Sequence, residues 1–127
     1  MSDTANKDIL IQVKTQYLEK HTSVPQQQYV FAYHIHIVNQ SVHVVQLLRR
    51  HWIITHAGGH IDVVDGEGVV GLQPVLRPGE SFEYQSSCVL KTPCGSMEGY
   101  YEMAREDGTL FRAEIEPFVL ATPYSLN

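Results

Sequence analysis

Along most of this chain, apolar and polar side chains alternate with a period of two, and this alternation limits the possible folds more than any other feature. The stretch QYVFAYHIHIVN at 28–39 is the clearest case. One face of that segment carries Tyr29, Phe31, Tyr33, Ile35 and Ile37. Aromatic and β-branched residues at alternate positions suit a pleated strand that is buried on one side. The pattern therefore predicts an all-β chain.

Turn signals divide the chain into about seven expected strands, with no amphipathic helix between them. Asn39-Gln40-Ser41 favours a tight turn that would return the strand at 28–39 against a strand at 43–55 as a hairpin. Pro78-Gly79 favours another turn, because proline presets φ and glycine accepts the positive φ that follows. The pattern predicts an antiparallel β-sandwich of immunoglobulin-like type, with a small barrel as the alternative.

Length and charge bound the domain count and the class of partner. The chain has 127 residues, and we expect a single domain at 8–124 between a flexible N-terminus at 1–7 and a short tail at 125–127. The first residues lack the basic start and apolar run of a secretory signal, and no apolar run is long enough to span a bilayer. We therefore expect a cytoplasmic protein. A net charge of −5 disfavours binding to nucleic acid or to anionic membranes.

The segment DGEGVVG at 65–71 contains the spacing G-x-G-x-x-G, supplied by Gly66, Gly68 and Gly71. That spacing binds a dinucleotide only where the loop leads into a helix whose free N–H groups face the pyrophosphate. Pro74 follows three residues later and prevents a helix from starting there. The simpler interpretation is that the glycines allow a tight crossover between the two sheets. An anion-binding nest of backbone amides is the alternative.

His34 and His36 are two residues apart on one expected strand, so their side chains would point the same way and could chelate an ion together. In the expected hairpin, the same face would also carry His43, Arg49 and His51. The opposite face, expected to be the core, would carry Tyr29, Phe31, Tyr33, Leu48 and Trp52. The face with the histidines could bind a metal, an anion or a protein, and a solvated outer face is the simpler interpretation. Arg49 argues against a metal, because a fixed cation repels another.

The sequence contains no recognisable catalytic set. The serines lack a nucleophile-elbow context, and no pair of carboxylates stands apart from the ordinary acidic surface. Cys88 and Cys94 do not form a C-x-x-C pair, and with no secretion signal we expect two reduced thiols rather than a disulfide or a zinc site. We therefore predict that the protein is not an enzyme and has no cofactor.

Several stretches together resemble the ApaG family of bacterial proteins. They are YVFAYHIHIVN, VQLLRRHWIIT, VVDGEGVVGLQPVLRPGESFEY, TPCGSMEGYYEM and AEIEPFVLATP, and the resemblance spans residues 8–123. It implies an immunoglobulin-like or fibronectin type III-like sandwich and an association with cobalt and magnesium resistance. It also implies a protein-interaction role, because ApaG-like domains are appended to F-box proteins and to a polymerase-interacting protein. The family's glycine motif, a candidate pyrophosphate site, maps onto Gly66, Gly68 and Gly71.

Three functional hypotheses follow from the residues and the resemblance. The leading one is a non-enzymatic interaction module that binds an unidentified protein and affects the homeostasis of divalent cations indirectly. It would not insert into a membrane, and weak homo-oligomers are compatible with it. The second is a nucleotide or pyrophosphate binder that uses the loop at 66–71. The third is a direct cobalt binder through His34 and His36, because magnesium prefers oxygen ligands.

Overall fold

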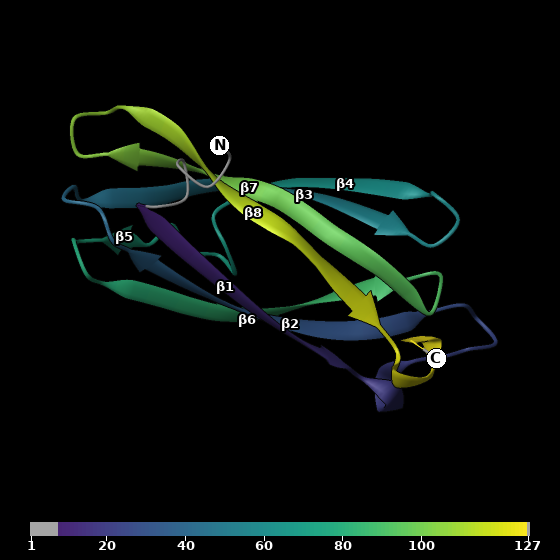
Figure 1. Cartoon of the computed structure of the whole chain (residues 1–127). Coiled ribbons are helices and arrows are strands. Elements are labelled where there is room, and N and C mark those ends of the chain that lie inside the picture. The colour runs from purple at the N-terminus through teal and green to yellow at the C-terminus, as the bar shows by residue number, and fades with distance from the viewer. Residues whose placement is uncertain (1–7, 127) are drawn as a thin grey trace.

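The computed structural model describes residues 8–126 as two antiparallel sheets packed face to face (Figure 1). The smaller sheet has the order β1-β2-β6, formed by Ile9–Tyr17, Tyr29–Asn39 and Ser81–Leu90. The larger sheet has the order β4-β3-β7-β8, formed by Ile61–Glu67, Val45–His56, Cys94–Arg105 and Leu110–Ala121. The two-residue strand β5, Val75–Leu76, also pairs with β3. The predicted all-β antiparallel sandwich is confirmed.

Two short 3-10 helices, Glu19–His21 and Pro123–Leu126, complete the described elements. Neither they nor any other described segment forms a helix long and apolar enough to cross a membrane. The second helix overlaps the tail expected at 125–127, while the N-terminal segment 1–7 and Asn127 lie outside the described residues.

The inward faces of the two sheets form one hydrophobic core around Trp52. Its ring meets Tyr33, Phe118 and Tyr101 edge to face, with centroids 5.6, 5.9 and 6.4 Å away. Such edge-to-face pairs contribute about 0.5–1.5 kcal/mol each beyond the apolar area they bury. Tyr29, Phe31, Tyr33 and Trp52 are buried as the alternation predicts.

Leu48 was predicted to lie in the core and is only half-buried, while Leu47 is fully buried. The cause is an irregularity in the pairing of β3 with β7 between Leu47 and Arg49. A bulge of this kind inserts one residue and exchanges the faces of every residue after it. As a result, Arg50 shares the inward side of β3 with Trp52, and Arg49 and His51 lie on the outer side.

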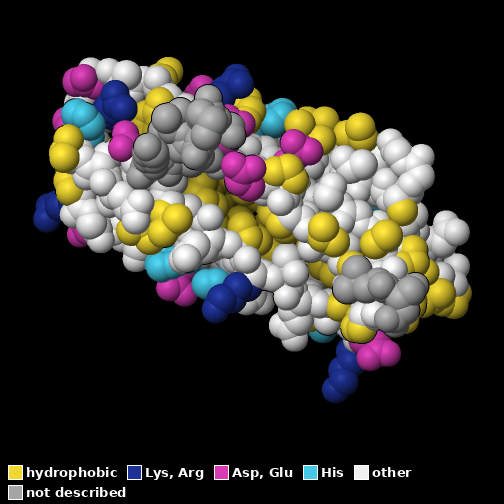
Figure 2. Space-filling view, in the orientation of Figure 1, with side chains coloured by type: hydrophobic (Ala, Val, Ile, Leu, Met, Phe, Trp, Pro, Cys, Tyr) yellow, Lys and Arg dark blue, Asp and Glu magenta, His cyan; other side chains and the backbone are white. Residues whose placement is uncertain are grey.

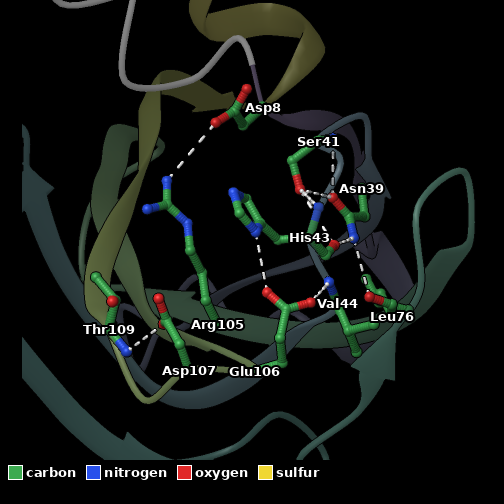
Figure 3. Close-up of polar contacts among 10 residues, drawn as sticks. All are labelled: Asp8, Asn39, Ser41, His43, Val44, Leu76, Arg105, Glu106, Asp107 and Thr109. Atoms are coloured by element: carbon green, nitrogen blue, oxygen red, sulfur yellow. Dashed lines mark hydrogen bonds and ion pairs between the residues drawn. The ribbon is translucent and has the colours of Figure 1, made fainter.

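The predicted hairpin between 28–39 and 43–55 is wrong, because β2 and β3 belong to different sheets. The connecting loop is held by the side chain of Asn39, which is 0% exposed. Its Nδ2 donates to the carbonyl oxygens of His43 and Leu76 at 2.7 and 2.9 Å, and its Oδ1 accepts hydrogen bonds from the amide and hydroxyl of Ser41 (Figure 3). Residues that favour turns can therefore form a crossover between the two sheets as readily as a hairpin within one sheet.

Candidate functional site

The outer face of the larger sheet brings together two predicted residues, Arg49 and His51, with an aromatic stack. The His51 ring stacks on Tyr100 with centroids 4.7 Å apart, and the Arg112 guanidinium lies 4.1 Å from the centre of the Tyr100 ring. His51 Nδ1 also lies 2.6 Å from a carboxylate oxygen of Asp65 on β4. Beside the stack is a shallow depression of about 370 Å³, lined in part by Glu98, Glu114 and Glu116. This face is therefore polar, open and largely acidic.

His34 and His36 lie on the outer face of the smaller sheet, away from Arg49 and His51. Their common face was correctly predicted, since both alternate outward along β2. The single face that was to unite them with Arg49 and His51 does not exist, because β2 is the central strand of the other sheet. His34 Nε2 lies 2.9 Å from Glu83 Oε1, and His36 Nδ1 lies 3.3 Å from Gln12 Oε1.

The described residues contain one group of three metal-ligating side chains with their ligand atoms within 4.8 Å of one another: His56, His60 and Asp62. It lies at the turn between β3 and β4. Sequence reasoning missed this group, although the signal was present in the stretch HAGGHID at 56–62. A two-strand hairpin closed by a short glycine turn brings its two ends together, and this geometry could have been used to find it.

The hydrogen bonds of His56 oppose a role in metal binding. Its Nδ1 accepts the backbone N–H of Lys91 at 3.0 Å, so the proton of the neutral ring lies on Nε2. That Nε2–H points to Asp62 Oδ2 at 2.8 Å, and this hydrogen bond is the largest cause of the lowered pKa of Asp62. Neither ring nitrogen keeps a free lone pair for an ion. The arrangement ties the β3–β4 turn to the start of the loop after β6.

We expect His56→Ala to lower the free energy of unfolding by about 2 kcal/mol, because it leaves the Lys91 amide without its buried acceptor. His60→Ala should change it by less than about 0.5 kcal/mol, since the His60 ring is mainly exposed. Urea unfolding of both variants measures the difference. Cobalt chloride should not raise the unfolding midpoint of the unaltered protein; a rise that is lost in His56→Ala would contradict the structural role.

The three glycines of the G-x-G-x-x-G spacing each serve the backbone in a different way. A Cβ on Gly66 would lie 2.7 Å from the Arg50 guanidinium, and one on Gly68 would overlap the Leu72 carbonyl oxygen. Gly68 and Gly71 also have positive φ, at 63° and 80°. Gly71 occupies a two-residue turn with Val70, whose φ of 44° is costly for a β-branched residue.

Gly66 lies within β4, and the loop that contains Gly68 and Gly71 joins β4 to β5; both strands pair with β3. The predicted crossover between sheets is therefore misplaced: the chain passes to the smaller sheet after β5, through the expected Pro78-Gly79 turn, where Glu80 N–H bonds to the Arg77 carbonyl at 2.9 Å. No helix follows the glycines, because β5 comes next among the described elements.

Several backbone amides that an anion nest in this loop would use are already engaged in hydrogen bonds. The amides of Gly68, Val69 and Leu72 donate to backbone carbonyls at 2.8–2.9 Å. Arg50 Nη1 donates to the carbonyls of Glu67 and Gly68 at 3.1 and 2.9 Å. A phosphate would have to break these bonds and would also meet the carboxylate of Glu67. Binding of a phosphate by this loop stays the untested alternative to a structural role of the glycines.

A buried thiol and a buried phenol in the core predict that the protein loses stability in alkaline solution. Burial raises the pKa of Cys88 to about 11 and raises the pKa of Tyr101 well above its usual value. The pKa of this thiol is higher in the folded chain than in the unfolded chain, where it is near 9. Its contribution to stability is therefore complete below pH 9 and is lost as the pH rises toward 11. We expect urea midpoints to fall across this window and to fall less in Cys88→Ala.

At pH 8 a disulfide reagent should modify Cys94, which is partly exposed, and leave Cys88 unmodified until the chain unfolds.

The fold defines a small antiparallel β-sandwich protein. The ApaG domain model matches residues 19–105. The chain is 48% identical over 119 residues to Protein ApaG of Proteus mirabilis, covering 94% of this chain and 95% of that protein, and 44% identical to Protein ApaG of Xylella fastidiosa strain M12 over the full length of both. The chain belongs to the ApaG family.

Solved structures agree with this assignment. The crystal structure of the putative ApaA protein from Bordetella pertussis has a TM-score of 0.88 and 46% sequence identity, covering 91% of this chain and 94% of that one. A second X-ray structure has the same TM-score with 44% identity, and covers 93% of this chain and 89% of that one. The described sandwich is therefore shared by these similar proteins.

Proposed function

We propose that this ApaG-family protein is a non-enzymatic, cytoplasmic interaction module that binds another protein and affects cobalt and magnesium homeostasis indirectly. The observation that carries the proposal is the concentration of exposed apolar side chains in one segment. Six of the thirteen exposed large hydrophobic residues in the described part of the chain lie between positions 61 and 75. They are Ile61, Val63, Val64, Val70, Leu72 and Val75. Exposed apolar side chains concentrated in one segment are typical of a protein-docking site.

Hydrophobic side chains reach the surface along the part of the molecule where Figure 1 places β3 and β4 (Figure 2). They are interspersed with acidic side chains, and the same segment contains Asp62, Asp65 and Glu67. Exposed apolar side chains among charged ones are a common composition of interfaces between proteins that also exist separately. This composition supports protein binding more than binding of a small ligand, which favours an enclosed cavity.

The use of the histidines supports a non-enzymatic role. Ring nitrogens of His34, His43, His51 and His60 face carboxylates of neighbouring residues on open surface, at 2.6–3.0 Å. A general base also needs a nucleophile within hydrogen-bond reach, and none of the described hydrogen bonds of these four rings is to a hydroxyl or a thiol. Pairs of this kind on open surface are ordinary stabilising contacts of small size.

The indirect link to divalent cations is supported by the chemistry of the histidine groups. His56 uses both ring nitrogens in hydrogen bonds, while His34 and His36 have Lys14 beside them in the same surface depression. A fixed ammonium group opposes the binding of a second cation. The proposal therefore assigns the effect on cobalt and magnesium to the protein that this module binds.

Affinity capture at native abundance tests the proposal. The tagged protein should recover the same partner in independent preparations, and the purified pair should re-form. A variant with Val63 and Val64 both changed to Lys tests the surface: it should fold but lose the partner if the segment at 61–75 is the docking surface. Failure to recover a partner after cross-linking would count against an interaction module of any kind.

A further inference from the structure

Strand β4 lies at the edge of the larger sheet and is exposed on both of its faces. It pairs with β3 on one side, and none of the described strands pairs with its other side. Ile61 and Val63, on the outer face, are 55% and 58% exposed, and Val64 on the inner face is also exposed. The three inward-facing residues of β4 are exposed or half-buried, so the smaller sheet does not cover the inner face of β4.

The pairing of β3 and β4 determines which backbone groups of β4 face outward. The bonds His56 N–H to His60 O and Gly68 N–H to Leu48 O mark hydrogen-bonded pairs at the two ends of the ladder. In an antiparallel ladder such pairs occur at every second residue, so Asp62, Val64 and Gly66 bond to β3. The amides and carbonyls of the alternate residues Ile61, Val63 and Asp65 therefore point away from the sheet.

The outward edge of β4 lacks several features with which proteins block unwanted strand pairing. It contains no proline, no lysine and no bulge in its pairing with β3. By contrast, β8 contains Pro117 and a register shift in its pairing with β7. β1 contains Lys14 and lies beside β8, which closes that side of the sandwich.

Charge indicates what kind of strand fits this edge. β4 contains Asp62, Asp65 and Glu67 and no basic residue. Pairing with a second copy would oppose two sets of carboxylates, which is destabilising for strands placed side by side. On the outer face, the neighbouring strand β3 places Arg49 opposite Glu67 and His51 opposite Asp65, and Glu98, Glu102 and Glu114 lie farther across the sheet on β7 and β8. A strand with basic residues opposite the carboxylates and apolar residues opposite Ile61 and Val63 would be complementary.

We propose that β4 is the docking strand of this protein and that its ligand is a basic, extended peptide segment of a partner protein, which adds to the larger sheet beside β4. This inference rests on the proposed interaction function and specifies its surface and the chemistry of its partner. Main-chain hydrogen bonds to Ile61, Val63 and Asp65 would provide affinity, and the alternation of acidic and apolar side chains would select the sequence. The carboxylates would also prevent self-pairing.

A synthetic peptide tests the proposal directly. The probe is Lys-Thr-Arg-Val-Val-Lys-Val with blocked ends, whose first and third residues would face Glu67 and Asp65 in the antiparallel pairing. Nitrogen-15 NMR titration of the full chain should shift the amides of Ile61, Val63 and Asp65 most. Methylating the peptide nitrogens of its third and fifth residues should weaken binding by about tenfold, because two main-chain donors are lost. Replacing its basic residues with Glu should abolish binding.

Two variants of the protein separate backbone pairing from charge. Val63→Pro removes an outward amide and leaves the ladder to β3 intact, so it should fold and bind the peptide about tenfold more weakly. Val63→Thr, which keeps the amide, is its matched control and should bind normally. Glu67→Lys should weaken binding of the basic peptide and strengthen binding of the peptide whose basic residues are replaced with Glu. The NMR spectrum of each variant shows whether β3 and the core remain folded.

Several outcomes would overturn the proposal. They are no binding at millimolar peptide, shifts centred on another face, equal binding of the methylated peptide, and concentration-dependent shifts of β4 without peptide, which would identify a second copy as the occupant. The proposed function can fail separately. A cellular partner captured equally by the unaltered protein and by Val63→Pro would refute docking at β4 and leave the interaction module standing, whereas recovery of no partner would refute the module itself.

Discussion

Replacing Gly99 with alanine should destabilise the protein by at least about 3 kcal/mol, which is a large part of the stability of a domain of this size. Gly99 is buried on β7 and pairs with Trp52 of β3. A Cβ on Gly99 would overlap the carbonyl oxygen of His51 and lie 3.1 Å from the Trp52 Cα. These are backbone atoms of a central strand, so relief would require β3 and β7 to separate. Urea unfolding, followed by tryptophan fluorescence, measures the loss.

Gly71→Ala is the matched control for Gly99→Ala. Gly71 has a φ of 80° and open space around the position of a Cβ, so alanine there meets backbone strain without a steric clash. We expect a loss of about 1 kcal/mol. If Gly99→Ala were no more destabilising than Gly71→Ala, the close approach of β3 to β7 would not be as described.

Asn39→Ala should lower the free energy of unfolding by about 3–4 kcal/mol, because several buried polar groups lose their partners at once. The carbonyl of Leu76 loses its donor, and the amide and hydroxyl of Ser41 lose their acceptor. These groups lie where the chain passes from β2 to β3 and where β5 approaches, so the loss should also loosen the connection between sheets. Thermal and urea unfolding provide the value, and hydrogen exchange at the start of β3 reports the local effect.

Gln40→Ala is the control for this position. Gln40 is the exposed neighbour of Asn39 in the same loop, and its side chain should contribute less than about 0.5 kcal/mol. Ser41→Ala should lie between the two variants. Equal stabilities of Asn39→Ala and Gln40→Ala would contradict the role assigned to the Asn39 side chain.

The sequence predicted those parts of the fold that depend on local pattern. Alternation along 28–39 identified the buried face of β2, and Pro78-Gly79 identified a turn, because both depend on neighbouring residues alone. Pro74 correctly indicated that no helix follows Gly71, since the effect of proline on a helix is local.

The parts that were predicted wrongly depend on which strands meet. A hairpin and a crossover begin with similar turn residues, and only the buried contacts of Asn39 distinguish them. The bulge after Leu47 places Leu47 in the core where Leu48 was predicted, and no marker in the sequence indicates it. The candidate histidine face is divided because β2 and β3 belong to different sheets. The importance of Gly99 was likewise invisible, because it arises from the backbone of a strand distant in sequence.

The exposed edge of β4 shows why the candidate site also needed the structure. An exposed edge strand is a natural docking element for an interaction module, and the sequence alone does not indicate which strand lies at an edge. The strand order showed that β4 lies at the edge of the larger sheet. The hydrogen bonds at the two ends of the β3–β4 ladder showed which backbone groups of β4 point away from the sheet. Once those were known, the acidic residues already visible in DGEGVVG indicated a basic partner.

Photo-cross-linking in cells tests the central claim, that the protein binds a partner through β4, most directly. A photoreactive residue would be placed at position 63 on β4 and, as a control, at position 89 on β6, where Val89 is comparably exposed. We predict a discrete cross-linked partner from position 63 that is lost when Glu67 is changed to Lys, and no such partner from position 89. Equal cross-linking from both positions, or a partner unaffected by Glu67→Lys, would contradict the account.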